Sequence, residues 1–344
     1  ALQDGGGIRG LSELMILGEI MERIKAENGL EEAPRPCEYF DIIGGTSTGG
    51  LVAIMLGRLG MSVQEAIAAY VRFARTVFSR KKWFFQDGTF KASVLERAIK
   101  EIVGRHTGDT EARMKTDYPN TRCKAFVCAM PGANLAAPRI FRSYDVKENN
   151  SYNCKIWEAA RATSAAPTFF KSIEVGEEDG VKERFVDAGS GCNNPVRQVL
   201  NEAHLVYGKE RQVACIVSIG TGHPNVIGLQ KPDAFQKILP TALIKVLQGI
   251  ATDCEKVSEE FEKEYADGNG NAKVYFRFNV QQGLQNVSLA EWDKLAEVKT
   301  HTVKYTGETQ VGSNISRLRQ LLTAGEVIQR IAATGEIVNT LGLV

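Results

Sequence analysis

Apolar positions recur at helical spacing directly after a run of glycines near the start of the chain. Between Leu11 and Ile24, apolar residues stand at positions 11, 14, 15, 20, 21 and 24. This spacing places them on one side of a helix and predicts an amphipathic helix over this stretch. A loop that contains Pro34 and Pro36 follows and separates this helix from the next apolar run.

The next apolar run predicts a strand, a sharp turn and a helix. Residues 39–43 (YFDII) are typical of a short buried strand. We expect Gly44 and Gly45 to break this strand and the apolar stretch over 51–58 to form a helix. Any residue between these two elements would therefore lie on a tight strand-to-helix turn.

Two more helices are predicted to begin at capping boxes, in which the first serine and the glutamate three residues later cap the helix N-terminus. The sequences SVQE from Ser62 and SVLE from Ser93 both match this pattern. Each stands at the head of a helical apolar pattern. We expect helices near 62–79 and 93–103.

Short runs rich in β-branched and aromatic residues predict further strands, with helical patterns between several of them. These runs are 123–130, 139–144, 184–186, 213–219 and 274–280. Alternating strands and helices indicate an α/β fold whose sheet is mainly parallel and covered on both faces. With no repeat or break in composition, we expect a single domain over 1–344, mostly helical from about residue 285.

Composition narrows the possible functions and environments. Lysine and arginine (42) nearly balance aspartate and glutamate (41), so no overall field favours nucleic-acid binding. The seven cysteines are scattered, odd in number and without a CxxC pair, which argues against a disulfide framework and a zinc site. We therefore expect no nucleic-acid partner, no metal and a reducing, cytoplasmic compartment.

The chain contains no uninterrupted apolar run of the roughly 20 residues that a membrane-spanning helix needs. It opens at Ala1 without an initiator methionine, three residues before its first glycine motif. We interpret it as a domain excised from a longer protein, in which fusion to further domains is expected.

The candidate nucleophile stands in the sequence GTSTG, from Gly45 to Gly49. This matches G-x-S-x-G, in which glycines permit a strained strand-to-helix turn that exposes the serine hydroxyl. The helix that follows directs its N-terminal amides toward developing negative charge. The pattern predicts Ser47 as the nucleophile, although a purely structural turn can carry the same letters.

A second glycine motif, DGGGIRG from Asp4 to Gly10, precedes the first predicted helix. Consecutive glycines leave backbone amides open to a substrate oxygen, so Gly5, Gly6 and Gly7 are candidates for an oxyanion hole. The same letters satisfy the dinucleotide pattern G-x-G-x-x-G. That pattern requires an acidic residue after a second strand, but here Glu27, Glu31 and Glu32 fall in a proline-bearing loop.

Together these motifs resemble the patatin-like phospholipase family. DGGGIRG is followed about 40 residues later by GTSTG, and the amino-acid sequence of residues 45–60 is particularly similar to that of fungal members. Three more segments match in the family's order: ATSAAPTFF over 162–170, FVDAG over 185–189 and VSIGTG over 217–222.

The resemblance implies a three-layer α/β/α sandwich and a lipid acyl hydrolase, of phospholipase A or lysophospholipase type, that needs no histidine, metal or cofactor. Ser47 matches the family nucleophile and Asp187 its partner in a Ser-Asp dyad. Asp187-Ala188-Gly189 departs from the family's usual Asp-Gly-Gly or Asp-Gly-Ala, which bears on the local backbone. Arg9 resembles a basic residue that binds a substrate phosphate or carboxylate, and a surface arginine that caps a helix is equally compatible with its position.

Two other functions remain open from the sequence. An α/β-hydrolase triad would combine Ser47 and Asp187 with His204, His223 or His301, but its nucleophile usually follows more strands than the two at most that precede Ser47. A non-catalytic lipid-binding signalling module would retain the fold without turnover, against which the intact motifs argue.

The sequence RKKWFF over 80–85 places three cations before three aromatic residues. Tryptophan favours the membrane–water boundary, and cations are attracted to anionic head groups. This segment is a candidate for peripheral membrane contact with the lipid substrate, and burial of its aromatic residues in the core is the alternative.

Overall fold

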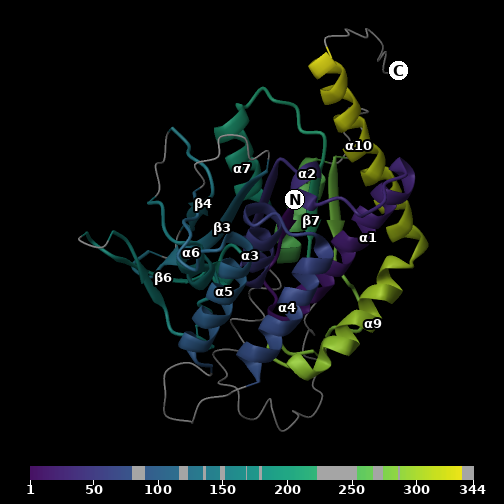
Figure 1. Ribbon diagram of the computed structural model, residues 1–344. Coiled ribbons are helices and arrows are strands. Elements are labelled where there is room, and N and C mark those ends of the chain that lie inside the picture. The colour runs from purple at the N-terminus through teal and green to yellow at the C-terminus, as the bar shows by residue number, and fades with distance from the viewer. Residues whose placement is uncertain are drawn as a thin grey trace.

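The structure is a computed structural model of the 344-residue chain (Figure 1). It describes residues 1–79, 90–115, 123–134, 137–147, 152–167, 169–177, 180–222, 254–265, 274–285 and 287–334. The segment 80–85 therefore lies outside the described residues.

A single mixed sheet organises the described chain. Its order is β5-β6-β3-β2-β1-β7-β8, and β4 also pairs with β3. The five strands from β3 to β8 in that order are parallel, whereas β4, β5 and β6 run antiparallel to their neighbours. The strands are β1 (Leu2–Gln3), β2 (Ile42–Thr46), β3 (Lys124–Pro131), β4 (Arg139–Arg142), β5 (Ile173–Val175), β6 (Glu183–Asp187), β7 (Ile216–Ile219) and β8 (Tyr275–Phe278).

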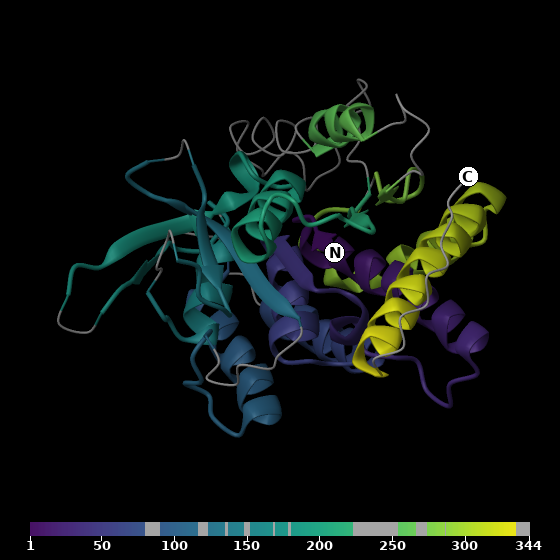
Figure 2. The same ribbon diagram turned by 90° about the horizontal axis from the view of Figure 1, so that it is seen from above.

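Helices cover both faces of the sheet, as Figure 2 shows from above. On one face, α1, α3, α4, α5, α6, α9 and α10 contribute to a shared core with the sheet, and on the other face α7 and the helical residues 254–264 do so. The helices are α1 (Gly10–Asn28), α2 (Pro36–Tyr39), α3 (Thr48–Ala53), α4 (Val63–Phe78), α5 (Ala92–Thr107), α6 (Ile156–Thr163), α7 (Val196–Tyr207), α9 (Leu295–Thr306) and α10 (Thr309–Thr334). A π-helical turn, Ile54–Arg58, continues α3.

Alternation along the strands explains the two cores. In β3, Phe126 and Cys128 pack on the α7 side, whereas Val127 and Ala129 pack on the opposite side. Successive side chains of a strand point to opposite faces, so a strand covered on both faces is apolar at nearly every position. The α/β class and the covered, mainly parallel sheet predicted from the sequence are confirmed.

Most predicted elements occur, with shifted boundaries. The helix over 11–24 is part of α1, and Ser62 caps α4 by accepting from Glu65 N at 3.2 Å, as expected. The expected capping box at Ser93 is wrong, because α5 already begins at Ala92 after Lys91. Strands β1 and β5, which are only two and three residues long, were not predicted.

The strand before Ser47 begins later in the sequence than predicted. Residues 36–39 form the short helix α2, and β2 begins only at Ile42. Gly44 and Gly45 do not end the strand but belong to it, paired with Phe126 and Val127 of β3. A Cβ at Gly44 would overlap the Phe126 ring, and one at Gly45 would overlap the backbone of Gly49. These glycines therefore allow close packing beside the turn rather than breaking the strand.

Candidate active site

Ser47 occupies the strained turn between β2 and α3. Its backbone has φ 58° and ψ −127°, and it is the only non-glycine residue with positive φ in the described part of the chain. Such a conformation is unfavourable for a residue with a Cβ and persists only where the surroundings enforce it. Ser47 N donates to Thr163 Oγ1 at 2.9 Å, and Thr163 Oγ1 donates to Cys128 O at 2.6 Å. The turn is thus tied to β3 through Thr163.

Asp187 meets Ser47 beside strand β3, where β6 follows the end of β2. Thr46, at the end of β2, pairs with Cys128, and Asp187, at the end of β6, pairs with Ala129. Adjacent positions of β3 therefore bring together two residues that are 140 apart in sequence. Ser47 Oγ donates to Asp187 Oδ2 at 2.5 Å.

The second carboxylate oxygen of Asp187 is also bound. Asp187 Oδ1 accepts from Gly189 N at 2.8 Å, within a 3-10 turn over Ala188–Ser190. Ala188 has no positive φ, so alanine fits the position where the family usually has glycine. The departure noted in the sequence therefore leaves this backbone intact.

Burial sets the charge state of Asp187. Its relative exposure is 4%, and desolvation raises the pKa of the carboxyl to about 7, against the opposing hydrogen bonds from Ser47 and Gly189. A carboxylate that is stabilised mainly by two hydrogen bonds in a poorly solvated site is more basic than an exposed one. Near neutral pH, such a group can exchange a proton with the serine hydroxyl.

The predicted oxyanion residues line one side of this pair. A Cβ at Gly5 would lie 2.9 Å from Ser47 Cβ, so the loop runs directly past Ser47. Gly7 has φ 57°, and a Cβ there would overlap the main chain of Leu289. Glycine is required at both positions by close approach, and at Gly7 also by backbone conformation.

The amides of this loop are not equivalent. Gly6 N donates to Thr48 Oγ1 at 3.1 Å, whereas the amides of Gly5 and Gly7 have no acceptor among the described residues. The Gly7 carbonyl accepts from the Tyr70 hydroxyl. Among the described residues, the amides of Gly5 and Gly7 are therefore free to donate to a substrate oxygen, which would compete with the Thr48 hydroxyl for the Gly6 amide.

Arg9 lies at the start of α1 and is buried, with 7% relative exposure, which rules out the surface arginine considered from the sequence. Desolvation lowers its pKa to about 10. Arg9 Nε has no hydrogen-bond partner among the described residues. Arg9 also forms no ion pair with any of these residues. A buried cation without a counter-charge favours an anionic ligand.

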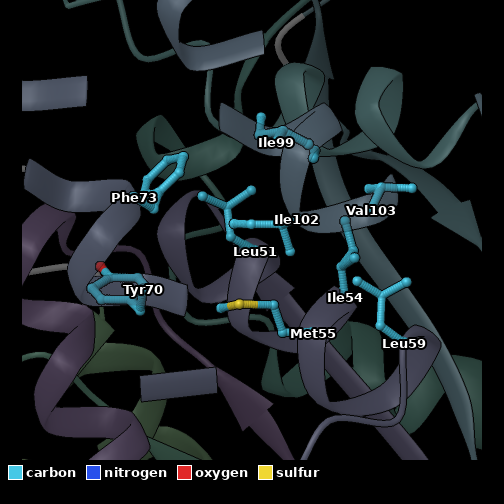
Figure 3. A pocket seen from close by; sticks show the side chains of 10 residues that line it. Leu51, Ile54, Met55, Leu59, Tyr70, Phe73, Ile99, Ile102 and Val103 are labelled. Atoms are coloured by element: carbon cyan, nitrogen blue, oxygen red, sulfur yellow. The ribbon is translucent and has the colours of Figure 1, made fainter. Parts of the chain in front are cut away.

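An apolar cavity lies beside α3, the helix that follows Ser47 (Figure 3). Its volume is about 20 Å³, and Leu51, Met55, Tyr70 and Phe73 are among the side chains that line it. That volume is close to what one water molecule requires. The cavity is therefore too small to hold an acyl chain in this conformation.

Neither metal ligands nor a histidine stand at the dyad in the residues that the structure describes. No group of three or more potential ligands is found in this part of the chain. Among the same residues, no helix is both long and apolar enough to cross a bilayer. Among the described residues, the Asp187 carboxylate accepts hydrogen bonds from Ser47 and Gly189, and His223 lies outside the described ranges.

Three polar residues of the site were not singled out from the sequence. Thr163 and Thr221 stood inside segments that resemble the family, and Thr48 stood inside GTSTG, but no role was attached to any of them. The only signal in the sequence was a threonine inside or next to a glycine motif. Its hydrogen-bond partner could be identified only from the fold.

Comparisons with known proteins agree with this architecture. The model of the family described as patatin-like phospholipase matches residues 3–200. The chain belongs to the patatin-like phospholipase family.

Individual relatives are distant. Calcium-independent phospholipase A2-gamma of Mus musculus is 28% identical over 319 residues, which cover 88% of this chain and 37% of the relative. Patatin-like protein 3 of Arabidopsis thaliana is 30% identical over 249 residues, covering 64% of this chain and 57% of the relative. A crystal structure of VipD from Legionella pneumophila aligns with 88% of this chain and 66% of VipD, at a TM-score of 0.39 and 12% identity. The chain thus spans little more than a third of the A2-gamma relative.

Proposed function

We propose that this protein hydrolyses acyl esters of phospholipids or related lipids through a Ser47–Asp187 dyad. The observation that carries the proposal is the 2.5 Å hydrogen bond from Ser47 Oγ to Asp187 Oδ2, at a strained turn and beside a buried carboxyl. Membership in a family of phospholipases supports the lipid substrate class.

The chemistry follows from the positions of these groups. Ser47 Oγ attacks the ester carbonyl carbon as its proton passes to Asp187, and the carbonyl oxygen becomes an oxyanion. Collapse of this intermediate breaks the ester C–O bond, and the leaving alkoxide takes the proton from Asp187. A water molecule then attacks the acyl-enzyme, transfers its proton to Asp187 and releases the fatty acid as Ser47 regains a proton.

The glycine loop would stabilise the oxyanion. Among the described residues the amides of Gly5 and Gly7 are free to donate, and a substrate oxygen would compete with Thr48 Oγ1 for the Gly6 amide. Removing one such donor typically costs about 3 kcal/mol of transition-state stabilisation. Hydrogen bonds from the loop would thus stabilise the negative charge on the carbonyl oxygen, which the dyad itself does not contact.

Arg9 would bind the anionic part of the substrate. It is buried and lacks a counter-charge among the described residues, so a lipid phosphate or carboxylate would supply one. An arginine guanidinium binds such groups through paired hydrogen bonds. This role is the substrate-binding function expected for Arg9 from the sequence.

We also propose contact with an anionic lipid surface near the end of α4. A groove of about 280 Å³ between α4 and α5 is lined by Arg72, Arg75, Arg105 and His106, and also by Glu101, which pairs with Arg105. Helix α4 ends at Phe78, and only Ser79 separates it in the sequence from RKKWFF over 80–85. Each cation near an anionic bilayer contributes about 1 kcal/mol of attraction.

The two other candidate functions predict different contacts. A Ser-His-Asp triad places a histidine between the nucleophile and the carboxylate, whereas Ser47 here contacts Asp187 directly. A non-catalytic module has no need for a strained serine beside a carboxyl of raised pKa. Both observations support the dyad.

The test is covalent labelling and turnover. We expect a stoichiometric burst with a fluorophosphonate and steady hydrolysis of a chromogenic short-chain ester, both lost in Ser47→Ala. Ser143→Ala is the matched control, because Ser143 is a buried serine on the far side of β3 whose Oγ accepts from Ala125 N at 2.9 Å. Labelling that persists in Ser47→Ala would refute the assignment of the nucleophile.

A further inference from the structure

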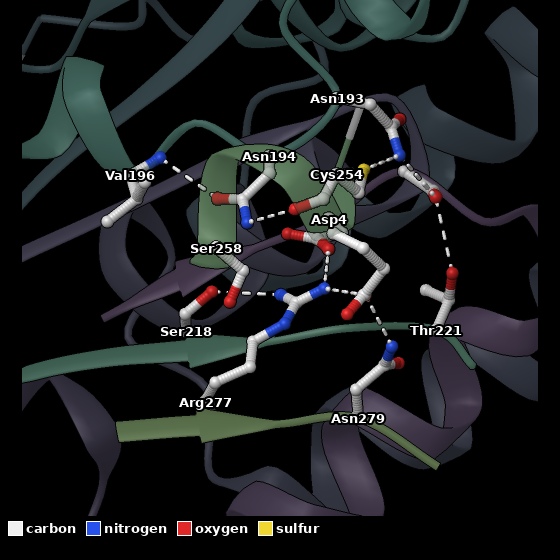
Figure 4. Close-up of polar contacts among 12 residues, drawn as sticks. Asp4, Asn193, Asn194, Val196, Ser218, Thr221, Cys254, Ser258, Arg277 and Asn279 are labelled. Carbon is white, nitrogen blue, oxygen red and sulfur yellow. Dashed lines mark hydrogen bonds and ion pairs between the residues drawn. The ribbon is translucent and has the colours of Figure 1, made fainter. Parts of the chain in front are cut away.

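The first residue of the glycine motif forms a buried ion pair with a strand near the far end of the chain (Figure 4). Asp4 Oδ2 lies 2.7 Å from Arg277 Nη2 of β8, and the side chains are 3% and 11% exposed. The two residues are 273 positions apart. Arg277 lies outside residues 3–200, which the family model matches.

Arg277 is fixed by two more partners. Its Nη1 donates to Ser218 Oγ of β7 at 2.9 Å, and its Nη2 also lies 3.2 Å from Glu255 Oε1. Glu255 Oε1 accepts in addition from Asn279 Nδ2 at 2.9 Å. Because the guanidinium is planar and its donors have fixed directions, these contacts determine where it presents a hydrogen bond to Asp4.

The residue after Asp4 is also held by side chains. The Gly5 carbonyl accepts from Asn193 Nδ2 and from Thr221 Oγ1, both at 3.2 Å. The peptide group between Gly5 and Gly6 is planar and trans, so its N–H points away from that carbonyl. On that opposite side, the Gly6 amide donates to Thr48 Oγ1, next to the nucleophile.

We propose that Arg277 is a positioning residue that acts through Asp4 to orient the amides of the glycine loop toward Ser47. This inference rests on the proposed acyl hydrolase function. Arg277 touches neither Ser47 nor Asp187 in the described structure, and its influence passes through one ion pair and the planar peptides that follow Asp4. The region beyond the family match thereby contributes directly to the geometry of the active site.

The ion pair is suited to this role because both ends are buried. Desolvation raises the pKa of Asp4, and the Arg277 charge opposes that rise. Without Arg277, the Asp4 carboxyl would face a buried environment with no cation and would take up a proton or shift its backbone. Either change alters the start of the loop that runs past Ser47.

Arg277→Met tests the proposal with a soluble short-chain ester as substrate. We expect kcat to fall about 10- to 100-fold with KM nearly unchanged, because a misplaced amide weakens the transition state more than substrate binding. Arg277→Lys keeps the charge but lacks the fork that bonds Ser218 and Asp4 together, so a smaller fall in kcat is expected. If Arg277→Met does not fold, Arg277→Lys decides the question.

The double variant Asp4→Asn, Arg277→Met provides a rescue. A neutral amide needs no cation, so part of the kcat lost in Arg277→Met should return. A role confined to stability would change the unfolding temperature without this pattern in kcat.

The matched control is the double variant Arg142→Met, Glu202→Gln. It removes another buried ion pair of the same sheet, in which Arg142 Nε lies 2.5 Å from Glu202 Oε2 and both side chains are 3% exposed. We expect lower thermal stability and an unchanged kcat. An equal loss of kcat in this control, or normal kcat in the folded Arg277 variants, would overturn the proposal.

The result is separable from the proposed function. Native protein that hydrolyses the ester only when Ser47 is present establishes the catalyst, whatever the Arg277 variants do. Native protein that is inactive, or whose activity survives Ser47→Ala, would instead refute the dyad.

Discussion

Replacing Asp187 by asparagine should stabilise the protein at alkaline pH while abolishing its activity. Burial raises the pKa of Asp187 from its ordinary value of 3.8 to about 7. The folded protein therefore holds a proton that the unfolded chain has already released between these two pH values. Raising the pH through this window favours unfolding, and the full cost of ionising Asp187 is present only above pH 7.

The size of the effect follows from the shift in pKa. A change of about 3 units at 1.36 kcal/mol each gives about 4 kcal/mol of lost stability at high pH. Because titration is gradual, about 3 kcal/mol of this loss falls between pH 5 and pH 8. Asparagine has nearly the same shape and no charge to desolvate, so the variant should avoid this loss.

Thermal unfolding at pH 5 and pH 8 measures the prediction. The melting temperature of Asp187→Asn relative to the native protein should rise by about 6 °C between these conditions, at about 2 °C per kcal/mol for a chain of this size. Asp4 and Glu13, whose pKa values are also raised by burial, are present in both proteins and cancel in the comparison. The same difference at both pH values would show that the carboxyl is not perturbed and would remove the basis for its role near neutrality.

Further expectations concern turnover. Asp187→Asn should reduce kcat at least about 100-fold, as loss of a general base does, in a folded protein; near-normal turnover would contradict the dyad. The native kcat/KM should rise with pH through an apparent pKa near 7 and then level off, because Asp187 must be ionised to accept the proton; a pH-independent rate from pH 5 to pH 8 would oppose this. Activity should persist in excess chelator and in each of the four His→Ala variants, and a large loss in one folded histidine variant would favour a triad. Lys81→Glu with Lys82→Glu, or Trp83→Ala, should impair hydrolysis of anionic vesicles but not of a soluble ester; equal effects on both substrates would reject interfacial binding by this segment.

The catalytic candidates could be named from the sequence because their chemistry is encoded locally. The turn around Ser47 needs glycines at fixed offsets, and the loop from Gly5 needs consecutive residues without a Cβ. These requirements act over a few residues and leave a readable pattern. The structure places Ser47 beside Asp187 and the glycine loop, and their catalytic roles stay predictions.

Element boundaries were harder to predict from the sequence, because they depend on contacts with residues elsewhere in the fold. Two consecutive glycines such as Gly44 and Gly45 are typical of the end of a strand, yet here they continue β2. Phe126 of β3 and the backbone at Gly49 fill the space where their side chains would lie. Strand β1, of two residues, has too short a pattern to be recognised. Its existence depends on β2 and β7, which flank it on both sides.

Only the tertiary structure decided which groups serve the site. The sequence by itself determined the α/β class and indicated the candidate nucleophile, the candidate base and the candidate oxyanion loop, since each is specified by periodicity or by a short motif. The bond from Gly6 to Thr48, the support of Ser47 by Thr163 and the pairing of Asp4 with Arg277 depend on where parallel strands from distant segments come together. Parallel pairing requires long crossovers, and its register is set by packing on both faces of the sheet rather than by neighbouring residues.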